Sequence, residues 1–496
     1  MTYRAQARKS IYWVVVARVA TKTVGFVEAL IVARLLARSL LGLVATANLV
    51  LSAMILFQEL GFSSALIYRR DRTEEAADTT FVTELTSSLI LYLIAAVGAA
   101  PIAWLLTGDA AMVAQVAPIL RLLALTLPIS ALSQVHLVLM AKELDFKSRV
   151  LPEIISGVIG TATVITLLLL RRGVWAVVYG RLAECIALTV LVWMVSPWRP
   201  RLRFNLQLAR EMFAYAKHVV GSQILIFFIT HVDDAFVVRL LGPYPYAGYN
   251  MAYDLSNRPA NEITRLFGQV MFPAFSKVQD DVAELRRIFL RTTRYIAYIS
   301  IPMSVCIAVF CDRFLDFAYG AKFADIVWPL RALVVYGMLR SIAANMGGIL
   351  KAGGKPHWLA RIAAIRLVAM VGLLYPATVQ YGILGVAVLS AAVSLVDFVA
   401  STWMVNRIIH ARATDYVSML LPPFVIAVGA AGVARAIFPY LSFMKGYYSL
   451  PLAGAIMMGV YGVVLWVADP DARHMVRSTC NDVWQRGRLI LRPREG

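Results

Sequence analysis

About fourteen stretches of roughly 20 or more mostly apolar residues follow one another along the chain, and they constrain its fold more than any other feature. A helix needs roughly 20 such residues to cross the apolar core of a membrane. Of the 496 residues, 60% are apolar and only 16% are charged, which is far from the balance of a soluble protein. The sequence therefore predicts an all-α integral membrane protein with about 14 transmembrane helices. The predicted spans are residues 11–36, 40–67, 80–107, 112–138, 150–170, 174–196, 212–241, 246–275, 291–312, 325–350, 357–379, 382–405, 417–438 and 449–468.

The first and second halves of the chain resemble each other at an offset near 205 to 210 residues. The matched segments are Val32–Leu36 with Val237–Leu241, Pro118–Arg121 with Pro329–Arg331, Ala141 with Ala352, Gly173 with Gly382, and Trp193–Val195 with Trp403–Val405. Each half contains six predicted helices. Because six is an even number, both halves cross the membrane in the same direction, and we expect two parallel six-helix repeats with a substrate path between them.

The repeat and the distribution of charge predict how the chain is organised. Lysines and arginines number about 27 in the loops of one side and about 6 in those of the other, so the positive-inside rule places both termini in the cytoplasm. The predicted parts are an N-lobe at residues 1–196, a cytoplasmic linker at 197–211, a C-lobe at 212–405, two extra helices within 406–468 and a basic cytoplasmic tail at 469–496.

The residue types also disfavour several classes of function. The net charge of +19 comes from short loops between apolar runs, so it indicates membrane topology and not nucleic-acid binding. The four cysteines lack the spacing of a metal site or a disulfide framework. We find no phosphate-binding glycine loop and no catalytic motif, and we expect no catalytic residues, no metal and no cofactor.

Charged residues inside apolar spans are costly, and they are therefore the main functional signal. In the first span, Arg18, Lys22 and Glu28 fall on one stripe of the helix, although Arg18 could instead extend to the inner headgroups. In the span 246–275, polar residues recur at helical spacing and line one face. They are Asp254, Arg258, Glu262 and Arg265. This face either lines a central cavity or forms a ladder of internal ion pairs.

Cations outnumber acids in the central spans, which suits a cavity for an anion. Guanidinium groups can donate two hydrogen bonds at once to phosphate oxygens. The candidate substrate-binding residues are Arg18, Lys22, Arg258, Arg265, Arg340 and Arg366.

Acids at matching places in the two halves are candidates for coupling or gating. Glu28 and Asp233 coincide when the halves are overlaid, and Asp254 and Glu262 lie on the polar face just described. They could titrate during transport, or they could pair with cations and lock one state. We expect Arg181 to pair with Glu184, three residues later.

Three segments resemble the Wzx-type polysaccharide flippases, in the superfamily that also holds the MATE exporters and the lipid II flippase. They are Val237–Tyr253, Val270–Gln279 and Trp328–Leu333. The resemblance covers nearly the whole chain. It implies a fourteen-helix, two-lobed flippase in the bacterial inner membrane that moves undecaprenyl-diphosphate-linked oligosaccharide to the periplasmic leaflet. It further implies contact with membrane lipids, and a polysaccharide polymerase and a chain-length regulator as partners.

Two alternatives remain open at the level of sequence. A MATE-like, ion-coupled exporter of small molecules would favour an acidic and aromatic pocket over this excess of cations. An integral-membrane polysaccharide polymerase or ligase would be expected to carry a large periplasmic loop, and the periplasmic loops predicted here are short. For a flippase, the membrane potential or a proton or sodium gradient could supply the energy.

Overall fold

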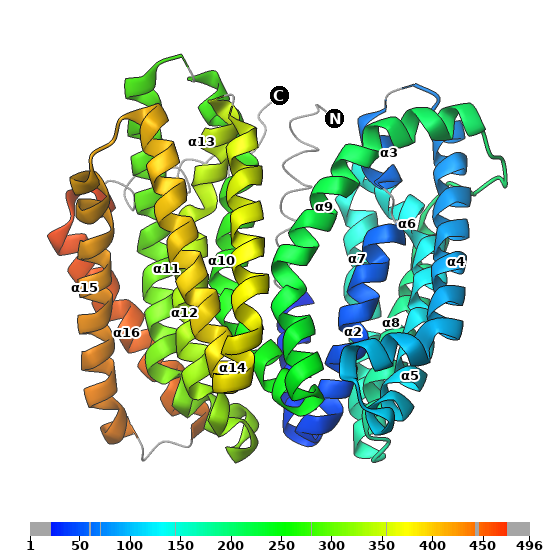
Figure 1. Cartoon of the computed structure of the whole chain (residues 1–496), viewed down its shortest axis with the longest axis horizontal. Helices are drawn as coiled ribbons and strands as arrows, with labels where there is room; N and C mark the ends of the chain where they lie inside the picture. The colour runs from blue at the N-terminus through cyan, green and yellow to red at the C-terminus, as the bar shows by residue number, and fades with distance from the viewer. Residues whose placement is uncertain are drawn as a thin grey trace, which may run out of the picture. The chain divides into compact units, whose positions relative to one another are not determined.

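The computed structural model describes residues 21–58, 61–69, 71–143, 145–278, 280–353, 355–441 and 446–473, and within these ranges the regular structure is entirely helical. A helix at residues 21–35 precedes α2 (Figure 1). The α-helices that follow are α2 (Arg38–Gln58), α3 (Phe62–Tyr68), α4 (Thr73–Thr107), α5 (Ala110–Ala124), α6 (Thr126–Lys142), α7 (Phe146–Leu169), α8 (Val174–Val195), α9 (Leu206–Leu241), α10 (Pro243–Lys277), α11 (Val282–Tyr319), α12 (Val327–Ile342), α13 (Met346–Ala352), α14 (Pro356–Ile409), α15 (Ala413–Ile437) and α16 (Gly446–Ala468). Short 3-10 turns lie at Ala321–Ile326, Ala343–Asn345 and Phe438–Leu441.

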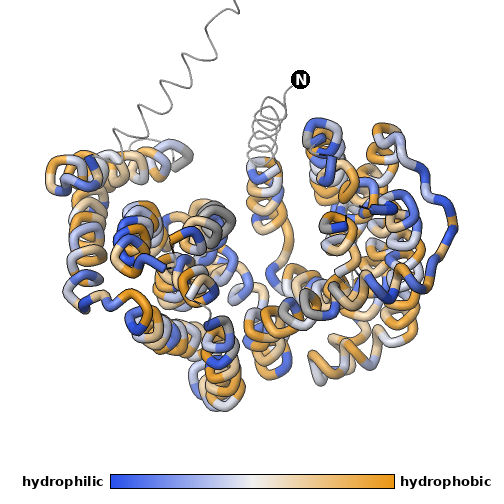
Figure 2. The backbone as a smooth tube through the Cα atoms, turned by 90° about the horizontal axis from the view of Figure 1, so that it is seen from above, coloured by the Kyte–Doolittle hydropathy of each residue, from blue (hydrophilic) through white to orange (hydrophobic). Residues whose placement is uncertain are grey.

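Ten helical segments of the described residues are long and apolar enough to cross a membrane, so the chain is a multi-pass membrane protein. Figure 2 shows hydrophobic residues along much of the helical length. The ten do not include α9 or α10, which are 36 and 35 residues long but carry several charged side chains. The all-helical membrane fold is confirmed, and the count of fourteen spans stays a prediction.

The predicted spans and the helices differ in how they are divided. The span predicted at 40–67 is broken before α3 at Gly61, whose φ of 71° is in the left-handed region. The spans predicted at 357–379 and 382–405 correspond to the two segments of α14, which are separated by a sharp bend at Gly382. Hydropathy alone does not reveal the break at Gly61, because it depends on the backbone conformation of a single residue.

Two glycines matched by the sequence repeat have nearly the same backbone conformation. Gly173 has φ 59° and ψ −133°, and Gly382 has φ 59° and ψ −144°. A residue with a Cβ atom rarely adopts these angles. Each glycine precedes the last of the six predicted helices in its half, so the matching conformations support the predicted repeat.

Two arginines matched by the repeat also make the same kind of contact. The Nε of Arg121 in α5 donates a hydrogen bond of 3.0 Å to the carbonyl oxygen of Ala96 in α4. The Nε of Arg331 in α12 donates one of 3.2 Å to the carbonyl oxygen of Ala308 in α11. Each half therefore uses an arginine to join its corresponding pair of helices.

The chain forms two compact units, of which unit 1 comprises residues 1–250 and 378–383 and unit 2 comprises residues 251–377 and 384–496. The boundary lies within α10 and not in the predicted linker at 197–211. The reason is that α9 packs inside unit 1, where Leu208 and Met212 join a buried cluster with Phe62 and Phe81. The predicted lobes were defined by the repeat, and their boundaries stay a prediction.

Helices α15 and α16 are fastened to α11 within unit 2. Buried residues of all three helices, among them Tyr298, Ala427 and Met457, form one apolar cluster. Arg435 of α15 pairs with both carboxylate oxygens of Asp312, at 3.3 and 2.8 Å. Apolar packing and a bidentate ion pair thus attach the additional helices to unit 2.

Candidate functional site

Arg366, one of the predicted substrate-binding residues, lies in a polar network inside unit 2. Its Nη2 donates a hydrogen bond of 3.1 Å to the hydroxyl of Tyr336 in α12. That hydroxyl is also 3.1 Å from the hydroxyl of Tyr253 in α10, and the centroids of the two rings are 5.7 Å apart. The guanidinium carbon of Arg366 is 5.7 Å from the centroid of the Tyr336 ring, within range of a cation–π attraction. The network therefore joins α10, α12 and the first segment of α14.

Arg340, a second predicted residue, lies one turn along α12 from Tyr336. Its Nη1 donates a hydrogen bond of 3.2 Å to Oδ1 of Asn257, which lies one turn along α10 from Tyr253. The Asn257 amide in turn donates to the carbonyl oxygen of Tyr253, at 3.0 Å. Both cross-helix pairs are separated by 83 residues, so α10 and α12 run parallel here.

A glycine allows α10 and α12 to come this close. A Cβ atom at Gly337 would overlap the backbone oxygen of Ser256. Gly337 follows Tyr336 directly, so the missing side chain permits contact at the level of the tyrosine pair. Small residues serve the same purpose at many interfaces between membrane helices.

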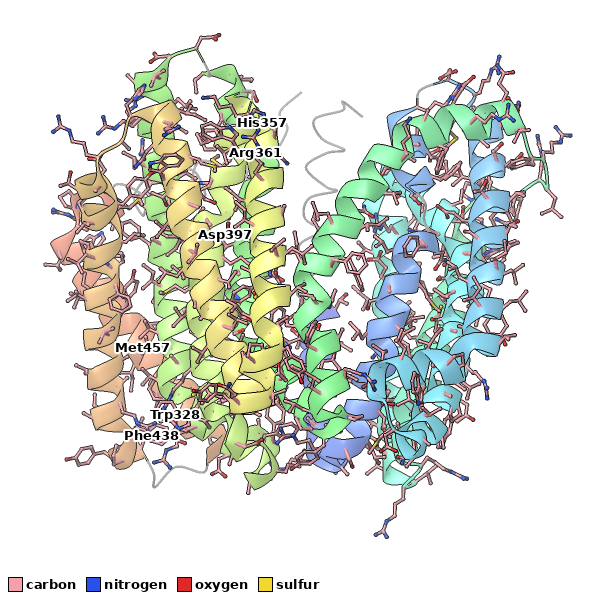
Figure 3. The ribbon with its side chains drawn as sticks, in the orientation of Figure 1. Trp328, His357, Arg361, Asp397, Phe438 and Met457 are labelled. Carbon is pink, nitrogen blue, oxygen red and sulfur yellow. The ribbon has the colours of Figure 1, made fainter. Side chains whose placement is uncertain are left out.

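Asp397, on the second segment of α14, is the acid nearest to Arg366. Its Oδ2 is 3.7 Å from Nη1 of Arg366, longer than a hydrogen bond, and its Oδ1 is 3.5 Å from the hydroxyl of Ser401. The two segments of α14 must therefore fold back on each other. Figure 3 shows Asp397 between the end of unit 2 marked by His357 and Arg361 and the end marked by Trp328 and Phe438.

The two charged side chains of the Arg366–Asp397 pair are mostly buried, but each keeps some exposed surface. The side chains of Arg366 and Asp397 are 19% and 27% exposed. An ionised pair within membrane helices costs a large desolvation free energy unless its hydrogen bonds are satisfied. A guanidinium has five N–H donors. Among the described residues, the structure records only the Tyr336 hydroxyl and the distant Asp397 as polar partners of Arg366. Arg366 can thus accept an additional anionic partner.

The contacts described above involve two of the predicted cations, Arg340 and Arg366. Arg18 and the side chain of Arg265 lie outside the described residues. Lys22 is exposed on the helix at residues 21–35, and Arg258 is exposed on α10. On the polar face of α10, Asp254 is exposed and Glu262 is partly buried. The proposal that these residues line a cavity stays a prediction.

The predicted coupling acids of unit 1 have different surroundings. Asp233 of α9 is 3% exposed and accepts a hydrogen bond of 2.5 Å from the Tyr249 hydroxyl. The next residue, Asp234, is also buried and lies 2.7 Å from Nδ1 of His231. Glu28 is only partly buried and accepts a 2.5 Å hydrogen bond from Thr161 of α7. The two acids thus occupy matching sequence positions but different environments.

One smaller prediction is confirmed, and three site residues were missed. Arg181 and Glu184 form an ion pair at 2.5 Å, as their spacing indicated.

Three residues of the network, Tyr253, Asn257 and Tyr336, were not identified from the sequence, because a tyrosine or a single amide in an apolar run resembles ordinary packing. Their only sequence signal is that Tyr253 and Asn257, like Tyr336 and Arg340, are four residues apart and so share a helix face.

Comparison with known proteins gives a consistent result. The family model described as "Polysaccharide biosynthesis protein" matches residues 31–328, more than half of the chain. The teichuronic acid biosynthesis protein TuaB of Bacillus subtilis (strain 168) is 25% identical over 379 residues, which are 76% of this chain and 77% of TuaB. The succinoglycan biosynthesis transport protein ExoT of Rhizobium meliloti (strain 1021) is 23% identical over 462 residues, covering 92% of this chain and 90% of ExoT.

A solved structure has a similar fold. The lipid II flippase MurJ, in an inward closed conformation, superimposes with a TM-score of 0.68 at 13% identity, covering 92% of this chain and 99% of that protein. At this identity the similarity concerns the fold alone. The similarity confirms the predicted fold class.

Proposed function

Because the chain belongs to the polysaccharide biosynthesis protein family, we propose that it is a flippase for undecaprenyl-diphosphate-linked oligosaccharides. It carries the repeat units of a polysaccharide from the cytoplasmic to the periplasmic leaflet of the bacterial inner membrane, with both of its termini in the cytoplasm. The family match over residues 31–328 is the observation that carries this proposal. The similarity to ExoT, a succinoglycan biosynthesis transport protein, and the fold shared with a lipid II flippase support transport over catalysis.

The chemistry of unit 2 suits the anionic part of such a substrate. A diphosphate presents several oxygens to hydrogen-bond donors, and a guanidinium can bind two of them side by side. Arg366 and Arg340 supply such groups from α14 and α12. In this proposal Arg18, Lys22, Arg258 and Arg265 add positive charge along the substrate path.

The membrane potential provides a sufficient driving force. Moving one negative charge outward across an inside-negative membrane releases about 2.3 kcal/mol per 100 mV, so two charges on a diphosphate would release about 4.6 kcal/mol. Coupling to protons or sodium through Glu28, Asp233, Asp254 or Glu262 is an alternative. A polysaccharide polymerase and a chain-length regulator would act on the product after its release.

Purified protein in liposomes tests the proposal directly. The vesicles carry a fluorescent undecaprenyl-diphosphate sugar, and a membrane-impermeant quencher reports how much of it has crossed. We expect the protein to accelerate its crossing but not that of a fluorescent phosphatidylcholine, which controls for non-specific scrambling. Folded protein that leaves crossing of the lipid-linked sugar at the protein-free rate would overturn the proposal.

A further inference from the structure

Charged pairs within unit 2 are of two kinds, and the difference points to a function for one of them. The two ion pairs that join the ends of α11 and α15 are close: Arg435 is 2.8 Å from Asp312, and Arg286 is 2.5 Å from Asp415. The Arg366–Asp397 pair, between the two ends of the unit, has a separation of 3.7 Å. The close pairs fasten α11 to α15, whereas the open pair leaves both of its members incompletely satisfied.

Arg366 is held by a neutral group and not by the acid. The Tyr336 hydroxyl accepts from its Nη2 at 3.1 Å, and Tyr253 lies behind that hydroxyl. The orientation of the guanidinium therefore does not depend on contact with Asp397. The acid contributes its charge at a distance, and its own second oxygen has only a long contact of 3.5 Å with Ser401.

We infer that Asp397 is a displaceable counter-ion, which neutralises Arg366 in the empty transporter and gives way when the diphosphate of the substrate binds. This inference rests on the proposed function and assigns a role within the same site. The incoming diphosphate takes the guanidinium donors that Asp397 leaves unused, while Tyr336 keeps the side chain oriented. When the substrate leaves, Asp397 again neutralises Arg366, so it weakens binding and promotes release. Asp397 in this scheme acts on the substrate only through the charge of Arg366 and does not contact the substrate itself.

Substitutions of Asp397 with opposite effects test the inference. Asp397→Asn removes the competing charge, so we expect tighter binding of the diphosphate and slower release. Asp397→Glu has a longer side chain that can close the gap to Arg366, so we expect weaker binding. Coupling between two groups that bind one protein typically changes affinity by about fivefold or more, and we expect the coupling between Asp397 and the diphosphate to be of this size. Opposite shifts of this size, measured with farnesyl diphosphate on the purified full-length protein in detergent, are the expected result.

Controls separate this role from a structural one. Asp312→Asn removes an acid from the close pair with Arg435, and it should leave the affinity for farnesyl diphosphate unchanged. In an Arg366→Gln background, Asp397→Asn should no longer change that affinity, since its effect passes through the guanidinium. Phosphatidylglycerol is titrated in parallel as a second phosphate source. If Asp397→Asn tightens binding of this lipid instead of farnesyl diphosphate, the assignment to a diphosphate is wrong.

The measurements distinguish a failure of the counter-ion role from a failure of the proposed flippase function. If the wild type moves the lipid-linked sugar but both Asp397 variants bind farnesyl diphosphate with wild-type affinity, the counter-ion role is refuted and the flippase remains. If the wild type moves no lipid-linked sugar but the two variants shift in opposite directions, the counter-ion role stands and the substrate must be another diphosphate. Absence of any binding of farnesyl diphosphate by folded wild-type protein also refutes the inference.

Discussion

The hydroxyl of Tyr336 sets the position of Arg366. Sequence reasoning predicted Arg340 and Arg366, because a charge in an apolar run is conspicuous. It could not predict their neighbours, since Tyr253, Asn257 and Tyr336 become significant only when α10 and α12 are known to pack side by side. At the scale of residues, the sequence shows which charged side chains lie in apolar spans, but only the fold shows which side chains contact them.

Tyr336→Phe tests the orienting hydrogen bond. The substitution removes one hydrogen bond to a charged group, worth about 1.5–3 kcal/mol, and we expect weaker binding of farnesyl diphosphate by at least about tenfold. Tyr416→Phe is the matched control, because its hydroxyl donates a 2.8 Å hydrogen bond to Asn406 away from the network. Equal losses of affinity in both variants would contradict the orienting role.

The elements of the fold follow from local sequence, apart from the places where single glycines decide the path. Apolar runs correctly predicted long helices, and the repeat correctly matched Gly173 with Gly382. The break at Gly61 was not predicted, whereas the predicted boundary between residues 379 and 382 coincides with the bend of α14 at Gly382. Hydropathy averages over a window of residues, whereas a bend depends on the φ and ψ angles of one.

Gly173→Ala and Gly382→Ala test whether the two halves use the same bend. Side chains are strongly disfavoured at these angles, so each substitution should lower the free energy of unfolding by about 1–3 kcal/mol. Steric overlap is not the cause, because a Cβ at Gly382 would meet nothing within 4 Å and one at Gly173 would meet only Leu40, at 3.8 Å. Thermal unfolding in detergent should show similar losses. A loss in one variant without the other would show that the bends are not equivalent.

The contact between α10 and α12 gives a second prediction about elements. Gly337→Ala places a Cβ against the Ser256 backbone, so we expect the variant to be destabilised by about 1–3 kcal/mol and to lose affinity for farnesyl diphosphate. Gly372→Ala is the control, since that glycine is exposed on α14 and a Cβ there would meet nothing within 4 Å. Its thermal stability should equal or slightly exceed that of the wild type. Unchanged stability and affinity in Gly337→Ala would mean that close helix contact is unimportant.

At the scale of the whole molecule, the class of protein was predicted correctly from the sequence. The family match confirms the resemblance to polysaccharide flippases, and the fold matches that of MurJ. The repeat places α9 at the start of the second half, and buried residues of α9 pack within unit 1, so the predicted lobe boundaries stay a prediction. An internal repeat shows which helices of the two halves correspond, but it does not show which helices pack against each other.

Membrane topology can be tested with single cysteines introduced into a variant that lacks the four native ones. The charge difference between the loops predicts that residues 205 and 280 face the cytoplasm and residue 244 faces the periplasm. A membrane-impermeant thiol reagent added to intact spheroplasts should therefore label Tyr244→Cys and spare Asp280→Cys. The reverse pattern would invert the topology and with it the proposed direction of transport.

The bend at Gly382 has a consequence for how the protein is made. The ribosome adds Arg366, in the first segment of α14, about 30 residues before it adds Asp397 in the second, a delay of a few seconds at bacterial rates of synthesis. A lone arginine at the centre of a helix raises the free energy of insertion through the translocon by about 2.5–3.5 kcal/mol. Insertion of the first segment therefore costs less free energy when that segment stays beside the translocon until the second segment has been synthesised. When the two segments enter the membrane as one helical hairpin, Arg366 and Asp397 enter the lipid as a pair.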